Sequence, residues 1–162
     1  YRIKDEGIKD FDVWFLEDTW AFKNKIIKKK PSFEALLDTT FFNVDSILYL
    51  YSFNRFLTYE NYFSDLENKL LDIRLEENPN PLSSFVRAIY LSNTLNLKVG
   101  RKLFHFLKKE IRNFDANLIE NYAREKYGAS DIFLKSNIEN LLNKIDMSSE
   151  NVFLSEEAFS IF

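Results

Sequence analysis

Glycine and proline are scarce, and this limits the folds open to the chain. The 162 residues include three glycines and three prolines, and neither type occurs between residues 32 and 78. Tight two-residue β-hairpins need positive backbone φ angles, which Gly or an Asn-Gly pair usually supplies. The sequence has no Asn-Gly, Asp-Gly or Gly-Gly pair. A β-rich fold is therefore disfavoured, and a helical bundle, which needs fewer tight turns, is favoured.

Apolar residues recur with helical spacing along most of the chain. In the first half, helices are predicted over residues 10–29, 47–56 and 59–73, with a short helix after the N-cap Ser32. Asn43 or Asp45 is the predicted N-cap of the helix over 47–56. In the second half, they are predicted after Ser83 or Ser84, over 97–112, between Asp115 and Gly128, and from Ser130 or Asp131 to residue 145, with a short turn at 155–157. The segment 47–56 is strongly apolar and is expected to lie at the centre of the core.

The predicted fold class is all-α, an irregular multi-helix bundle of about seven or eight helices. Aromatic residues make up 17% of the chain, and 17 residues are Phe, so an aromatic-rich core is expected. The length suggests a single helical domain over residues 1–162. Because Pro79 and Pro81 restrict the residues before them, 76–82 is the best place for a joint between subdomains.

One predicted helix carries an uneven distribution of charge. The formal net charge is -3, with 22 basic and 25 acidic residues, so the protein as a whole is not a nucleic-acid binder. On a helical wheel of residues 98–112, however, basic side chains gather in one arc. This basic face consists of Lys98, Arg101, Lys102, His105, Lys108, Lys109 and Arg112. It is either an anion-binding or partner-binding surface, or a solvated helix face neutralised by acids such as Glu76 and Glu77.

The residues that most catalytic chemistries require are missing. There is no cysteine, and His105 is the single histidine, so thiol catalysis and common zinc sites are excluded. The sequence also lacks a glycine-rich phosphate loop, a nucleophile elbow and a calcium-binding loop. We therefore expect no catalytic residues, no metal site, no cofactor and no enzymatic activity.

The remaining class of function is the binding of another molecule. The first hypothesis is a non-catalytic protein-protein interaction domain, a subunit, adaptor or regulator of a larger assembly. The alternative is a helical domain that binds an anion or nucleic acid through the basic face. The expected partner is another protein or the rest of a larger chain, since the sequence starts at Tyr1 and stops on an apolar stretch. With no apolar run of about 18 residues, a soluble intracellular protein without a membrane span is expected.

Overall fold

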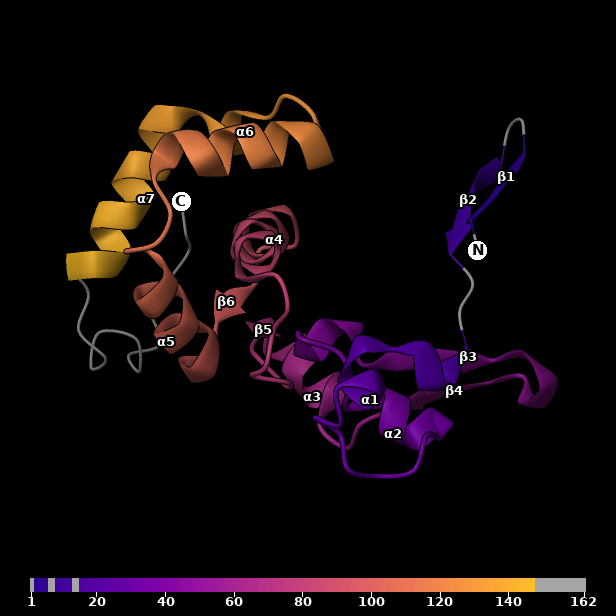
Figure 1. Ribbon diagram of the computed structural model, residues 1–162. Helices are drawn as coiled ribbons and strands as arrows, with labels where there is room; N and C mark the ends of the chain where they lie inside the picture. Colours follow the sequence, from indigo (N-terminus) through magenta and orange to yellow (C-terminus); the bar gives the residue numbers. More distant parts are fainter. Residues whose placement is uncertain (1, 6–7, 13–14, 148–162) are drawn as a thin grey trace.

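The computed structural model describes residues 2–5, 8–12 and 15–147. Helices α4 to α7 form one end of the molecule, and α1, α2, α3 and a long β-hairpin form the other (Figure 1). The short strands β5 and β6 lie between the two ends. The predicted turn at 155–157 falls outside the described residues.

The described residues contain seven α-helices and six strands, joined in places by short 3-10 turns. The helices are α1 (Trp20–Lys23), α2 (Phe33–Leu37), α3 (Tyr62–Glu67), α4 (Pro81–Thr94), α5 (Arg101–Glu110), α6 (Ala116–Tyr127) and α7 (Lys135–Met147). The strands are β1 (Arg2–Asp5), β2 (Ile8–Asp12), β3 (Ile47–Leu50), β4 (Arg55–Thr58), β5 (Leu70–Leu71) and β6 (Lys98–Val99). They pair as β1 with β2 and β3 with β4, both antiparallel, and as β5 with β6 in parallel.

The main core lies among α4, α5, α6 and α7. Helix α4 is central, because Phe85, Val86, Ala88 and Ile89 are completely buried. Leucines and isoleucines from the other three helices complete this core, together with the strands β5 and β6. Burial of these side chains supplies most of the driving force for folding this end of the molecule.

The all-α prediction is wrong. The structure is predominantly helical, but it is a mixed fold that contains three two-stranded sheets. In the described part of the chain, four of the five positive φ angles belong to residues other than glycine, namely Lys25, Asn54, Lys69 and Asn96. Asparagine tolerates this region because its short polar side chain can bond locally. The scarcity of glycine therefore did not exclude hairpins.

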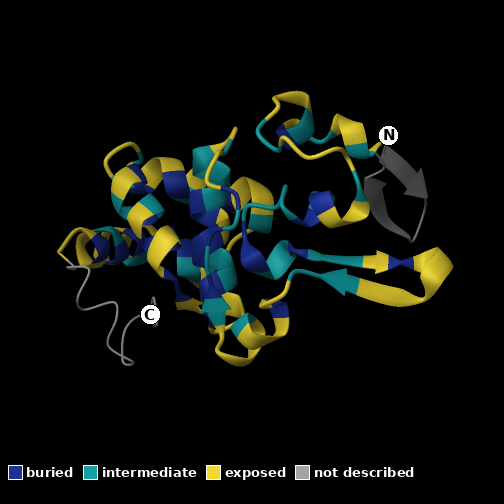
Figure 2. Cartoon of the chain, turned by 90° about the horizontal axis from the view of Figure 1, so that it is seen from below, coloured by how far each residue is buried: buried dark blue, intermediate teal, exposed yellow. Residues whose placement is uncertain are grey.

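Aromatic side chains are divided between the core and the surface. Phe42, Phe85, Phe104 and Phe133 are buried in the main core, and six further rings pack against it, from Phe41, Tyr90, Phe106, Phe114, Tyr122 and Tyr127. Eight other aromatic side chains are exposed, and all of them belong to residues 15–63. The outer part of the β3–β4 hairpin is coloured as exposed in Figure 2.

The predicted first helix over 10–29 does not form. Residues 8–12 belong to strand β2, and over the described residues 15–29 only the four residues of α1 are α-helical. Lys25 adopts a positive φ of 57°, which ends the helix directly after its C-cap, Asn24. The lysines at 28–30 therefore do not interact with the end of a helix dipole.

The predicted central helix over 47–56 is instead the β3–β4 hairpin. Ile47 pairs with Thr58 and Leu50 with Arg55, and a 3-10 turn over Tyr51–Phe53 joins the strands. Asn54 closes the turn in the left-handed region, with φ 47° and ψ 45°. Asn43, expected to cap a helix here, is a buried side chain with a different role.

Three helix boundaries are confirmed. The Ser32 hydroxyl accepts a hydrogen bond from the backbone N–H of Ala35 at the start of α2. The Asp115 carboxylate accepts one from the N–H of Leu118 at the start of α6, and α6 ends at Gly128, which has φ 77°. Each boundary is set by residues three positions apart or by one backbone angle, so neighbouring residues suffice to predict it.

Candidate functional site

Helix α5 carries five of the seven residues predicted for the basic face. Lys98 belongs to strand β6 instead, and Arg112 follows the helix, whose C-cap is Ile111. Leu103, Phe104 and Leu107 bury the opposite side of α5 in the core. The amphipathic character predicted for this segment is therefore present, on a shorter helix.

Three of the lysines on this face have partners. The Lys102 ammonium lies 3.2 Å from the Glu76 carboxylate, and Lys109 lies 3.5 Å from the buried carboxylate of Glu110. Lys108 lies over the Phe104 ring, 5.7 Å from its centroid. Glu76 is one of the acids expected to neutralise the face. The density of uncompensated charge is thus lower than the sequence suggests.

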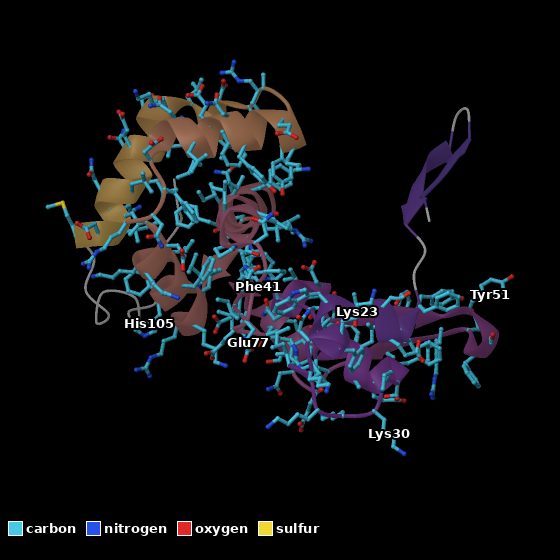
Figure 3. The ribbon with its side chains drawn as sticks, in the orientation of Figure 1. Lys23, Lys30, Phe41, Tyr51, Glu77 and His105 are labelled. Atoms are coloured by element: carbon cyan, nitrogen blue, oxygen red, sulfur yellow. The ribbon has the colours of Figure 1, made fainter. Side chains whose placement is uncertain are left out.

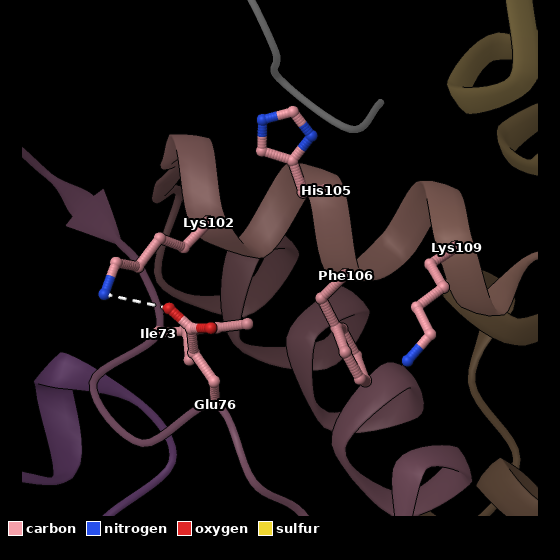
Figure 4. A pocket seen from close by; sticks show the side chains of 6 residues that line it. All are labelled: Ile73, Glu76, Lys102, His105, Phe106 and Lys109. Atoms are coloured by element: carbon pink, nitrogen blue, oxygen red, sulfur yellow. Dashed lines mark ion pairs between the residues drawn. The ribbon is translucent and has the colours of Figure 1, made fainter.

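A pocket of about 290 Å³ opens beside α5. Ile73 and Phe106 form its apolar wall, and Lys102 and Lys109 flank it (Figure 4). His105 also borders the pocket. Its ring projects away from the Glu76 side in the close view (Figure 4), so the pocket shows no pair of groups suited to acid–base catalysis.

A distant carboxylate holds the start of α5 in place. Gly100 is the N-cap and has no side chain to offer, but the Asp72 carboxylate accepts a hydrogen bond from the Leu103 N–H at 2.8 Å. The same oxygen accepts from the Ile73 N–H at 2.9 Å. Burial raises the pKa of Asp72, and these backbone hydrogen bonds counteract part of the shift.

Asn43 connects this cap to the other end of the molecule. Its buried amide donates to Asp65 and to the Leu70 carbonyl, both at 2.9 Å. Its carbonyl oxygen accepts from the N–H groups of Val44 and Asp72, at 3.0 and 2.9 Å. One side chain thus makes four hydrogen bonds, and it fixes the segment that presents Asp72 to α5.

A second surface, which the sequence analysis missed, is formed by the β3–β4 hairpin. Its turn and neighbouring residues expose four aromatic side chains, Tyr49, Tyr51, Phe53 and Phe56. We call these four residues the aromatic hairpin. The signal that could have found them is the alternation in the run 47–51, but such a short apolar run also fits a helix.

The aromatic hairpin has a defined internal geometry. Tyr49 and Phe56 are directly opposite each other across the strands, with ring centroids 5.0 Å apart. The Tyr49 hydroxyl donates to the Asn54 side chain at 2.5 Å. The Arg55 guanidinium lies 5.6 Å from the centroid of the Phe53 ring. These contacts order the aromatic side chains while leaving them accessible to solvent.

The two surfaces lie far apart. Tyr51 marks the tip of the hairpin at one end of the molecule, and His105 lies at the other end (Figure 3). A substitution in one surface therefore does not remove contacts in the other.

Comparison with protein-family models, curated proteins and solved structures finds no match. Within the described residues, no group of three or more His, Asp or Glu side chains could hold a metal ion. The helices in that same part of the chain are all too short or too polar to cross a bilayer. Function must therefore be inferred from the two surfaces themselves.

Proposed function

We propose that the protein is a protein-interaction domain that binds its partner through the aromatic hairpin. The observation that supports this function is the exposure of three large rings on one hairpin, with Tyr51 88%, Phe53 65% and Phe56 64% exposed. Tyrosine and phenylalanine are enriched at protein interfaces because they bury a large area with little loss of side-chain entropy. Clusters of exposed apolar side chains commonly mark such interfaces.

The other face of the hairpin is already used within the protein. Leu50, which alternates with Tyr49 and Tyr51 along the chain, is buried. Leu48 lines a cavity together with Leu36 and Leu37 of α2. Helix α2 contacts both strands of the hairpin, so the hairpin is anchored on one side.

Site-specific photo-crosslinking tests this function. A benzophenone amino acid placed at Tyr51 should give a discrete crosslinked adduct with a partner protein in extracts of the source cells. The same amino acid placed at Met147 on α7 should not, although Met147 is equally exposed at 87%. Adducts are measured by gel shift and identified by mass spectrometry.

A second pair of variants controls for unspecific adhesion. Phe53→Ser and Phe56→Ser should abolish the adduct from Tyr51, while each lowers the free energy of unfolding by about 1 kcal/mol or less, because the ring contacts that are lost are exposed. Identical adducts from positions 51 and 147, or adducts that survive both serine variants, would count against the aromatic hairpin as the binding surface.

The alternative function, anion or nucleic-acid binding by the basic face, has weaker support because Lys102 and Lys109 already face carboxylates. If it is correct, single-stranded DNA retains the protein at low ionic strength, and retention falls steeply with added salt. Charge reversal at Lys102 and Lys109 then weakens retention but leaves the Tyr51 adduct unchanged. We expect that the unmodified protein does not bind single-stranded DNA at low ionic strength, as measured by the fluorescence anisotropy of labelled DNA.

A further inference from the structure

A cavity lies far from the basic face, between α1, α2 and strand β3, on the side of the hairpin opposite its exposed tyrosines. Its volume is about 510 Å³, within the usual range of about 300–1,000 Å³ for small-ligand sites. The Trp20 ring, Leu37 and Leu48 supply apolar walls. The carboxylates of Asp18 and Asp45 and three threonine side chains supply its polar groups.

The hydroxyl protons of these threonines are already committed. Thr19, Thr39 and Thr40 each donate a hydrogen bond to the backbone carbonyl three residues earlier, at 3.1, 2.7 and 3.1 Å. The Thr40 hydroxyl is also hydrogen-bonded to the Ser46 hydroxyl. Thr19 and Thr39 therefore supply the hydroxyl oxygens that can still accept a hydrogen bond from a ligand. An ionised carboxylate also only accepts. The hydroxyl and carboxyl side chains of the cavity therefore call for a ligand that donates hydrogen bonds.

Both carboxylates of the cavity already face a cation, and one of these two ion pairs can exchange its cation for that of a ligand. Asp18 faces the Lys23 ammonium at 3.1 Å, and Asp45 faces the Arg87 guanidinium at 2.7 Å. The Asp18–Lys23 pair is largely exposed, and such pairs contribute little, so an entering cation can replace Lys23. The Trp20 ring can add an attraction for a cation placed over its face.

From this lining we infer that the cavity between α1, α2 and β3 binds an ammonium group carried on an apolar stem. The stem packs against Trp20, Leu37 and Leu48, and the ammonium donates to Asp18 and to the threonine oxygens that can still accept. A lysine side chain of a peptide and a free aliphatic amine share this chemistry. This inference is independent of the aromatic hairpin and of its partner.

Three probes with one hydrocarbon stem separate charge from hydrophobicity. Hexylammonium, hexanol and hexanoate are titrated into the isotope-labelled protein, and NMR shifts are followed at the Trp20 indole and the Thr39 and Thr40 amides. Hexylammonium should saturate these shifts at a concentration about tenfold or more below that of hexanol, as expected for hydrogen bonds to a charged group. Hexanoate should give no saturable shift. Equal binding of hexanol and hexylammonium would refute the inference.

Matched variants locate the ammonium. Asp18→Asn should weaken hexylammonium binding about two- to fivefold, the range expected for one exposed ion pair. Asp146→Asn on α7 removes the same charge far from the cavity and should leave binding unchanged. Equal effects of the two variants would show a general charge effect and overturn the site.

A final comparison distinguishes the two natural sources of the ammonium. Nα-acetyl-lysine methylamide presents a lysine side chain in a peptide context. If it shifts the same three signals with an affinity similar to that of hexylammonium, the cavity accepts a peptide lysine. If hexylammonium alone binds, the ligand is a free amine. Both results uphold the ammonium site, and binding of neither probe excludes it.

Discussion

Replacing Asn43 by alanine is expected to lower the free energy of unfolding by about 3–5 kcal/mol, because it leaves several buried polar groups without partners. The lost bonds join Asn43 to Asp65, to the Leu70 carbonyl and to the N–H of Asp72. No other side chain in the described structure is bonded to that N–H. Urea denaturation followed by circular dichroism measures the change.

Two further variants show whether the hydrogen bonds cause this loss. Asn43→Asp keeps the size but cannot donate, and it places a third carboxylate beside Asp65 and Asp72, so it should be at least as unstable as the alanine variant. Asn68→Ala removes an exposed amide that donates to the Ser64 carbonyl at 2.9 Å. This control substitution should lower the free energy of unfolding by less than about 1 kcal/mol. A loss of similar size in Asn43→Ala and Asn68→Ala would contradict the role of Asn43.

Replacing Gly100 by alanine should lower the free energy of unfolding by about 2–4 kcal/mol, because the added methyl group overpacks the site and weakens the helix cap. A methyl group at this position would lie 2.3 Å from Cγ and 2.6 Å from Cβ of Asp72. The carboxylate would have to move, and its hydrogen bonds to the Leu103 and Ile73 N–H groups would weaken. Gly100 is therefore needed for close approach and not for its φ angle, which is −76°.

A double-mutant cycle isolates this contact. Asp72→Gly removes the atoms that the new methyl group would meet, so Gly100→Ala in that background should cost less than about 1 kcal/mol. Both pairs of variants are compared by thermal and urea unfolding. An equal cost of Gly100→Ala in the two backgrounds would mean that the Asp72 side chain is not the obstacle.

The fold was predictable where local residues decide the structure. The caps Ser32 and Asp115 act on N–H groups three residues away, and both were found from the sequence. The hairpin was not found, because its strands need each other: Tyr49 lies opposite Phe56, and Asn54 supplies the reversal. Helix and strand periods fit such a short apolar run equally well.

The candidate sites divide in the same way. The basic side chains of α5 follow from helical periodicity, although their ion pairs do not: Glu76 lies 26 positions before Lys102, and only the fold brings the two together. The aromatic hairpin was not predicted, because large aromatic side chains were expected to be buried. Phenylalanine is usually buried, but a folded surface still contains much apolar area. The exposure of a particular ring is thus a tertiary property.

The Asp72 cap also determines how α5 opens. An isolated helix frays from its ends, and its first amides exchange with solvent most readily. Here the Leu103 N–H is bonded to a residue 31 positions away, and β5 and β6 pair next to it. Hydrogen exchange at Leu103 therefore requires that the start of α5 separates locally from the segment 70–73. The exchange rate of this one amide reports how often that separation occurs.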